Sequence, residues 1–391
     1  MSTLTCPCCD SREIASFFEV RGVPVNSVLM LKDRREALDF PRGDIVLGHC
    51  KSCGFIYNTT FEPKRLEYSE RYDPTQAFSE TFNAWHKKLA SDLIEKYELR
   101  GKRVLEIGCG KGEFLCMLCE LGGNSGVGFD PAYTEGRNAP AAAQNIEFVR
   151  DFYSEKYAGY SGDFVICKMT LEHIHDVQRF LTSVRRAIGD GTSHVFFQVP
   201  DVQRILEERA FWDIYYEHCC YFSMGSLARA FRRAGFDVLD LAREYGNQYL
   251  MVEARPGKGA PSQPLPQEDD LGTLSSLVAE FSSQFAKLRA AWSERIAAFR
   301  AAKKRVCIWG SGSKGVAFLT TMQLSDSIEY VVDINPHRQG HCMLGTGHKI
   351  VGPQDLPSAP PDVVIVMNPV YRDEIANQLR TLGLGPELLT T

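Results

Sequence analysis

The sequence lacks the features that mark several large classes of protein. It has no apolar run approaching the roughly 18 residues that span a bilayer, and its first residues have neither the basic nor the apolar region of a signal peptide. It carries no basic stripe with interleaved aromatic residues, and its formal net charge is −5. We therefore expect neither a membrane protein nor a nucleic-acid-binding protein. With 391 residues, 44% of them hydrophobic, the chain is long enough for two or three domains with cores of their own.

A disulfide framework is also missing, although the chain has 13 cysteines. Most are scattered, and several lie inside apolar segments: Cys109, Cys116, Cys167 and Cys307. Cysteines in this setting are typical of reduced thiols in a core. We therefore expect a cytoplasmic protein.

Cysteines near the N-terminus form a second population, arranged as two C-x-x-C pairs. The pairs are Cys6 with Cys9, and Cys50 with Cys53. In an intracellular protein such pairs favour zinc over redox chemistry, and four thiolates with no open position indicate a structural metal. Cys8 is an alternative donor beside the first pair. His49, next to Cys50, is expected to be a surface residue and not a ligand.

Residues 104–112, VLEIGCGKG, are the most informative stretch of the chain. The branched apolar residues predict a buried parallel strand, in which the carboxylate of Glu106 needs a functional reason. Gly108 and Gly110 follow in a turn where a missing Cβ lets backbone N–H groups approach a ligand, and an apolar segment at helical spacing comes next. This combination favours a cofactor site over an ordinary tight turn.

Polar residues then follow the ends of further predicted strands. The strands are 126–131, 146–153 and 163–167, and the residues at or after their ends are Asp130, Asp151, Phe152, Lys168 and His173. Asp130 comes about 20 residues after the glycine turn, where an acidic group suits the hydroxyl pair of a ribose. Open α/β sheets bind ligands at the carboxyl ends of their strands, so we expect these residues to line one site.

Residues 211–222, FWDIYYEHCCYF, come after a predicted fifth strand at 194–200. They are rich in ionisable and phenolic groups: Asp213, Tyr215, Tyr216, Glu217, His218 and Tyr221. This density after a strand indicates a catalytic segment. The alternative is a polar network whose hydrogen bonds are satisfied within a core.

The region 304–391 again begins with a strand, a glycine turn and a helix. Gly310, Gly312 and Gly315 have the G-x-G-x-x-G spacing, and Asp333 ends a second predicted strand. Alone, this pattern would suggest a dinucleotide site, but it is a weak signal without a catalytic complement. We expect a degenerate Rossmann-like domain that packs on the catalytic domain and helps to bound the substrate.

The chain divides into four parts on these patterns. Residues 1–65 form the metal-binding cap, and 66–255 alternate strands and helices as a doubly wound α/β domain does. Residues 256–303 hold a Pro/Gly/Ser-rich linker (256–267) and an amphipathic helix. Residues 304–391 form the last domain.

At the glycine turn the sequence resembles class I S-adenosylmethionine-dependent methyltransferases, whose first signature is E-x-G-x-G-x-G. In the order of its parts it is similar to the three-domain, zinc-containing C-methyltransferases that act on nucleotide-linked sugars. The motifs that carry this resemblance are the paired C-x-x-C, VLEIGCGKG, LEHI at 171–174, FWDIYYEHCCYF, and SKG with VVDINPHRQG within 313–340. The implied α/β fold is a class I methyltransferase Rossmann-like domain flanked by an N-terminal zinc-binding domain and a C-terminal Rossmann-like domain.

The resemblance also implies S-adenosylmethionine as cofactor and a structural Zn²⁺. The cofactor-binding residues it implies are Glu106, Gly108, Gly110, Asp130, Pro131, Asp151, Phe152 and Lys168. Asp130 would hold the ribose, Asp151 would accept from the adenine amino group, and Phe152 would pack on the ring.

For catalysis the resemblance implies His218 as the general base, with Glu217 orienting it or balancing its charge. Tyr215 and His173 would line the same pocket, and Tyr72 corresponds to a tyrosine on the substrate side. The implied reaction is C-methylation next to a ketone of a nucleotide-linked sugar or a related metabolite. Two alternatives are an O- or N-methyltransferase of another small metabolite, and a non-enzymatic or NAD-dependent module centred on the last domain.

Overall fold

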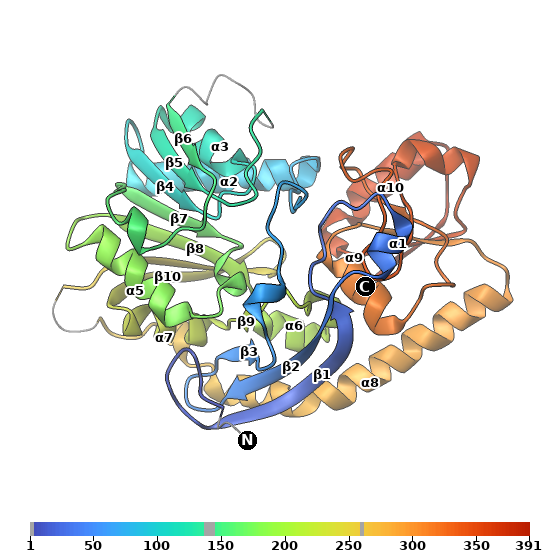
Figure 1. The fold of residues 1–391 in the computed structure, drawn as a ribbon, viewed down its shortest axis with the longest axis horizontal. Coiled ribbons are helices and arrows are strands. Elements are labelled where there is room, and N and C mark those ends of the chain that lie inside the picture. Colours follow the sequence, from blue (N-terminus) through green and yellow to red (C-terminus); the bar gives the residue numbers. More distant parts are fainter. Residues whose placement is uncertain (1–3, 137–144, 259–261) are drawn as a thin grey trace.

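The computed structural model of the protein describes residues 4–136, 145–258 and 262–391, and within them the chain forms three β-sheets (Figure 1). The largest has seven strands in the order β10-β11-β8-β7-β4-β5-β6. Its parallel strands are β4 (Arg103–Ile107), β5 (Ser125–Phe129), β6 (Ile146–Val149), β7 (Phe164–Lys168) and β8 (His194–Pro200), and its antiparallel edge is β10 (Phe236–Glu244) and β11 (Tyr249–Pro256). This is the doubly wound α/β sheet expected from the alternating pattern.

Helices cover both faces of the seven-stranded sheet because successive strand residues point to opposite sides. Val104 and Ile166 pack with α2 and α3, whereas Leu105 and Cys167 pack with α5 and α7. The helices are α2 (Glu80–Tyr97), α3 (Glu113–Gly122), α5 (Val177–Ile188), α6 (Val202–Glu208) and α7 (Met224–Arg233). Covering both faces explains why these strands are almost continuously apolar.

The strands predicted at 126–131 and 163–167 lie within one or two residues of β5 and β7, and 194–200 coincides with β8. The strand predicted at 146–153 is too long, because β6 ends at Val149. A tight turn follows, in which the Asp151 N–H donates to the Val149 carbonyl (2.9 Å), so Asp151 and Phe152 lie in a loop. This loop stands at the carboxyl edge of the sheet, beside the end of β5.

The N-terminal part is an antiparallel sheet in the order β1-β2-β3-β9. Its strands are β1 (Ile14–Pro24), β2 (Arg42–Cys50), β3 (Ile56–Asn58) and β9 (Cys220–Tyr221), and the short helix α1 (Arg34–Leu38) connects β1 to β2. The register pairs Ile14 with Cys50, which sets the segment before β1 beside the segment after β2. The fourth strand, β9, comes from far along the chain and begins two residues after His218. The sheet therefore reaches the segment 211–222.

The C-terminal part is a five-stranded parallel sheet in the order β14-β13-β12-β15-β16. Its elements are β12 (Val306–Trp309), α9 (Ser313–Met322), β13 (Val331–Val332), β14 (Ile350–Val351), β15 (Val363–Val366), α10 (Arg372–Thr381) and β16 (Glu387–Thr390). It has the strand, glycine turn and helix that the G-x-G-x-x-G spacing predicts, with Asp333 directly after β13.

A single long helix, α8 (Leu271–Ala301), joins this part to the rest and runs along β1 (Figure 1). Phe281, near its middle, packs edge-on against Phe18 of β1 (5.3 Å between ring centroids), and Trp292 packs against Phe318 of α9 (5.2 Å). This is the amphipathic helix expected after the linker. Of the linker predicted at 256–267, residues 259–261 lie outside the described residues, as do residues 1–3 of the cap. None of the described helices is long and apolar enough to cross a membrane.

Gly43 of β2 provides a test of how tightly the N-terminal sheet packs on the segment 211–222. A Cβ at this position would overlap the ring of Tyr216, whose hydroxyl accepts a hydrogen bond from the Glu62 N–H (2.9 Å). Gly43→Ala should therefore lower the free energy of unfolding by about 1–3 kcal/mol through overpacking. Gly159→Ala, where the new methyl meets open space, is the matched control. Equal midpoints of thermal unfolding for the two variants would show that the contact between Gly43 and the Tyr216 ring has room for a methyl group.

Candidate active site

A cavity of about 640 Å³ opens at the carboxyl edge of the seven-stranded sheet. Its walls include the glycine turn after β4, the residues after β5 and β7, and the segment that precedes β9. The glycine turn after β12 closes it from the C-terminal part, and Tyr68 and Tyr72 close it from the N-terminal part. A volume of this size suits a cofactor together with a small substrate.

The first glycine turn and Asp130 form one end of the cavity. Gly108 and Gly110 have φ angles of 71° and 57°, and a Cβ at Gly108 would collide with the Thr170 hydroxyl. The Asp130 carboxylate accepts from the Gly110 N–H (2.9 Å) and from the Ala132 N–H (2.7 Å). The structure thus brings together the residues predicted at this edge. The absence of side chains at the two glycines leaves open space beside their backbone, where a ligand can approach.

Glu106 and Lys168 lie at the base of the same cavity, on the neighbouring strands β4 and β7. One oxygen of Glu106, Oε2, has no hydrogen-bond partner among the described residues. Burial raises the pKa of Glu106 and lowers the pKa of Lys168, whose Nζ is 2.7 Å from Nε2 of His86. An unpartnered buried oxygen in a cavity wall fits a site that a polar ligand completes.

Asp151, Phe152 and Pro131 also line the cavity, at its open rim. The Tyr157 hydroxyl (2.7 Å) and Lys156 both donate to the Asp151 carboxylate, and Lys156 lowers the pKa of this group to about 2. The Phe152 ring is 59% exposed, which is unusual for a large apolar side chain. All eight predicted cofactor residues therefore border one cavity.

At the other end of the cavity, the side chains of Tyr215, His173 and Glu172 lie around His218. The Tyr215 hydroxyl is 2.9 Å from Nε2, and the ring of His173 stands perpendicular at 4.8 Å between centroids. Oε1 of Glu172 is 3.8 Å from Nε2. Burial, together with His173 and Lys314, holds the pKa of His218 well below its usual value, so the imidazole is neutral at pH 7.

The predicted pairing of Glu217 with His218 is wrong. The Glu217 carboxylate does not line the cavity; it accepts hydrogen bonds from Asn26 Nδ2 (3.1 Å) and from the Ser27 hydroxyl. The Tyr72 hydroxyl also bonds to this carboxylate, while the Tyr72 ring lines the cavity as predicted. Residues 216–217 form a turn, after which His218 lines the cavity while Glu217 bonds to the N-terminal part. The carboxyl group nearest His218 is Glu172.

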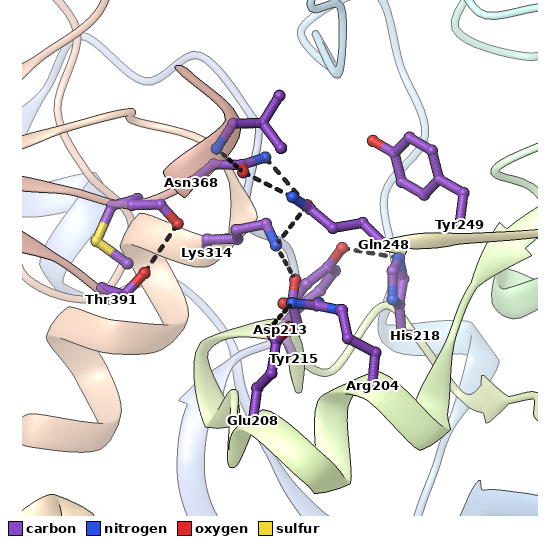
Figure 2. A network of polar contacts seen from close by, with 12 residues as sticks. Arg204, Glu208, Asp213, Tyr215, His218, Gln248, Tyr249, Lys314, Asn368 and Thr391 are labelled. Atoms are coloured by element: carbon purple, nitrogen blue, oxygen red, sulfur yellow. Dashed lines mark hydrogen bonds and ion pairs between the residues drawn. The ribbon is translucent and has the colours of Figure 1, made fainter. Parts of the chain in front are cut away.

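A buried polar network joins the C-terminal part to this site (Figure 2). Lys314 of α9 forms an ion pair with Asp213 (2.5 Å), and Asp213 is also paired with Arg204 of α6. Gln248 accepts from Lys314 (3.3 Å) and bonds to Asn368 (2.8 Å), which follows β15. Figure 2 shows the Tyr215–His218 pair beside this network. Sequence patterns gave no role to Glu172, Arg204 or Lys314; the only signal was that Glu172 and Lys314 lie inside the motifs LEHI and SKG.

The four predicted cysteines lie together where the segment before β1 meets the end of β2. The sulfur atoms of Cys6, Cys9, Cys50 and Cys53 all lie within 4.8 Å of one another. The Cys6–Cys53 and Cys9–Cys50 separations are 3.7 and 3.5 Å. Four sulfurs at about 2.3 Å from a central zinc would be about 3.8 Å apart, so the arrangement fits a tetrahedral site.

The two residues beside these cysteines lie outside the cluster of four. The Cys8 thiol is buried and contacts Gln178 (3.7 Å) and the Cys53 thiol. His49 is not the surface residue that was expected: it is buried, with 2% of its surface exposed, because β2 is an interior strand between β1 and β3.

Comparison with known proteins agrees with this architecture. A family model described as a methyltransferase domain matches residues 80–241, and one described as a C-methyltransferase C-terminal domain matches residues 254–385. The C-methyltransferase NovU of Streptomyces niveus is 27% identical over 353 residues, which are 85% of this chain and 81% of that protein. The fold and these matches define an S-adenosylmethionine-dependent methyltransferase of class I. The two models match residues 80–241 and 254–385 separately, and together they support a C-methyltransferase family for this chain.

Solved methyltransferase structures resemble parts of the chain. Magnesium protoporphyrin IX methyltransferase from Synechocystis PCC 6803 is 14% identical, covers 45% of this chain and 84% of its own, and has a TM-score of 0.37. The 1,6-didemethyltoxoflavin-N1-methyltransferase of Burkholderia thailandensis is 18% identical, covers 46% of this chain and 84% of its own, and has a TM-score of 0.35.

The position of Asp130 predicts a specific loss of cofactor affinity. Asp130→Ala removes a charged hydrogen-bond acceptor from the cofactor end of the cavity, and it should weaken S-adenosylmethionine binding by about 2–4 kcal/mol in calorimetry. The control is Asp163→Ala, which removes a carboxylate that accepts from the Arg103 N–H (2.9 Å) at the opposite edge of the sheet. Unchanged affinity in Asp130→Ala, or an equal loss in both variants, would contradict a direct role of Asp130.

Proposed function

We propose that this enzyme methylates a carbon atom next to a ketone of a small metabolite, most specifically of a nucleotide-linked sugar. The observation that carries the proposal is the neutral, buried imidazole of His218 at the end of the cofactor cavity, with Tyr215 and His173 against it. A carbon acceptor becomes nucleophilic only when a base removes its proton, and a neutral imidazole has the free lone pair that this step needs.

The cofactor supplies an electrophilic methyl group on a sulfonium when it is bound. Gly108 and Gly110 bring the backbone close to it, Asp130 holds the ribose hydroxyls and Asp151 accepts from the adenine amino group. Phe152 and Pro131 lie at the rim of the cavity, where the exposed Phe152 ring would pack on the adenine. Glu106 and Lys168 complete the base of the site, where the unpartnered oxygen of Glu106 is available to the polar end of the cofactor.

His218 is the general base of this proposal. It takes the proton from the acceptor carbon, and the electrons of the broken C–H bond are delocalised into the neighbouring carbonyl group, which becomes an enolate. Tyr215 and His173 are donors for the developing oxyanion. Tyr72 stands on the substrate side, where it connects the acceptor to Glu217. Glu217 thereby acts on the acceptor pocket through Tyr72 and not through His218.

The C-terminal part closes the substrate end of the cavity. The turn Gly310–Gly315 and Lys314 form the wall opposite the cofactor cradle, so an acceptor must fit between the two sheets. The matched relative is named a C-methyltransferase, which supports carbon over oxygen or nitrogen as the methylated atom.

We also propose that the four cysteines bind a structural zinc ion. The ring of four thiols surrounds one point with spacings that suit tetrahedral coordination, and it includes no residue of the catalytic cavity. The metal would join the segment before β1 to the end of β2, and its binding energy would contribute to folding of the N-terminal part.

Metal analysis tests the zinc site. Protein purified without added zinc should contain about one equivalent, and Cys53→Ser should lose the metal and lower the melting temperature. Cys8→Ser alters the neighbouring thiol outside the cluster of four. This variant should keep the metal and the wild-type melting temperature. Metal-free protein with unchanged thermal stability would rule out a structural zinc.

Hydrogen exchange at the acceptor tests the role of His218. Incubated in D₂O with a panel of nucleotide-linked 4-keto sugars and no S-adenosylmethionine, the wild-type enzyme should exchange the hydrogen next to the ketone. His218→Ala should bind the cofactor normally but lose this exchange and about 10²–10⁴-fold in turnover. Exchange that persists at the wild-type rate in His218→Ala would assign the base to another residue.

A further inference from the structure

Glu172 is the buried carboxyl group that the proposed mechanism does not yet use. It lies in the short turn Leu171–His173 after β7, with 1% of its surface exposed. Neither of its carboxyl oxygens has a hydrogen-bond partner within the described part of the chain. Nε2 of His218 is 3.8 Å from Oε1, and a ring nitrogen of His173 also lies within 4.8 Å of the carboxyl group.

A buried carboxylate without a hydrogen-bond partner can remain ionised only at a large cost in free energy. Burial raises the pKa of Glu172 to about 8 and lowers the pKa of His218 well below its usual value. At pH 7 in the ligand-free protein, both groups are therefore uncharged. The exchangeable proton of the pair resides on Glu172.

We propose that Glu172, in its ionised form, is the counter-charge that lets His218 accept the proton of the substrate carbon. In this step the C–H bond breaks, its electrons stay on the carbon as the enolate, and the proton joins the imidazole. With Glu172 ionised, the net charge of the pair changes from −1 to 0. With Glu172 protonated, the same step would leave a buried imidazolium without a counter-ion, which is strongly unfavourable.

This inference rests on the proposed function, since it assigns a partner to the base named there. Glu172 acts through His218 and is a positioning residue. Glu217 cannot take this part, because its oxygens are occupied by Asn26, Ser27 and Tyr72.

Glu172, His173 and His218 also have the spacing of a three-ligand metal site. A pair of base and counter-charge is the better interpretation, because each imidazole already holds a tyrosine hydroxyl. The Tyr215 hydroxyl is 2.9 Å from Nε2 of His218, and the Tyr68 hydroxyl is 3.0 Å from Nδ1 of His173.

Other ionisable groups around the pair come from every neighbouring element: His173, Tyr68, Cys167, Tyr215, Cys220, Tyr221, Tyr249 and Lys314. Burial keeps the pKa values of the tyrosines and of these two cysteines above their usual range, and it lowers the pKa of His173 to about 4. Lys314 is held in its ion pair with Asp213, although burial lowers its pKa. Three carboxyl groups of the cavity region titrate near neutrality: Glu172, and Glu217 and Glu106, whose pKa values burial raises to about 7. Glu106 lies at the base of the cofactor cradle on β4, next to β7, which carries Lys168.

The sign of the pH dependence follows from the raised pKa of Glu172. Below this pKa Glu172 is protonated and gives no counter-charge, so proton abstraction is slow. Above it the carboxylate is present, so the rate should rise with pH through the ionisation of Glu172.

Histidine ¹⁵N NMR on the full chain, without substrate, tests the pairing directly. The ring signals of His218, assigned by their loss in His218→Asn, should shift once near the ionisation of Glu172. Glu172→Gln should abolish this shift, and Glu217→Gln, which changes the adjacent carboxyl group, should retain it. A shift that survives in Glu172→Gln, or that disappears in Glu217→Gln alone, overturns the proposal.

The same variants are then compared in the deuterium exchange of a nucleotide-linked 4-keto hexose. Glu172→Gln should lower the exchange rate about 10²-fold and remove its rise with pH, while the KM for the sugar stays close to the wild-type value. Glu172→Asp keeps a carboxylate and should recover part of the rate, which separates a charge effect from a folding defect. If His218→Ala exchanges normally, His218 is not the base, and the mechanism proposed above fails together with the role of Glu172. If His218→Ala is inactive but Glu172→Gln behaves as wild type, only the role of Glu172 fails.

Discussion

Burial of ionisable side chains between three sheets is the constraint on which this structure depends. A charge in such a place must be paired or must be neutralised. Asp213 satisfies the first condition, because Arg204 and Lys314 both bind it and so hold the C-terminal part against the methyltransferase sheet. Glu172 and His218 satisfy the second, since both are uncharged in the ligand-free protein. The same environment that weakens His218 as a base thus also supplies the acid whose ionisation can activate it.

The three parts of the chain contribute different functions to one cavity. The seven-stranded sheet supplies the cofactor cradle at Gly108, Gly110 and Asp130, as open α/β sheets do at the carboxyl ends of their strands. The N-terminal sheet pairs with β9 and thereby fixes the chain from the second residue after His218. The C-terminal sheet closes the remaining side through α9. The cavity requires all three, so the site is completed by tertiary packing and not by one domain alone.

Local patterns predicted the parts of the fold and of the site that depend on neighbouring residues. The strand, glycine turn and helix at 104–121 and the two C-x-x-C pairs are of this kind, because a short segment contains the whole signal. Patterns did not predict that β9 joins the N-terminal sheet or that Glu217 turns away from His218. Both depend on contacts with residues about 160 to 190 positions away, between β3 and β9 and between Glu217 and Asn26. The pairing of Lys314 with Asp213 was missed for the same reason: neither residue carries the signal alone.

The central claim is that the cavity activates a carbon acceptor for methyl transfer, and the bond that forms tests it most directly. The enzyme can be incubated with S-adenosylmethionine carrying a ¹³C-labelled methyl group and with a panel of nucleotide-linked 4-keto sugars, and the product can be examined by NMR. Carbon–carbon correlations from the labelled methyl group to the carbon next to the ketone are the predicted result. A labelled methyl group bonded to oxygen or nitrogen of the acceptor would contradict the account.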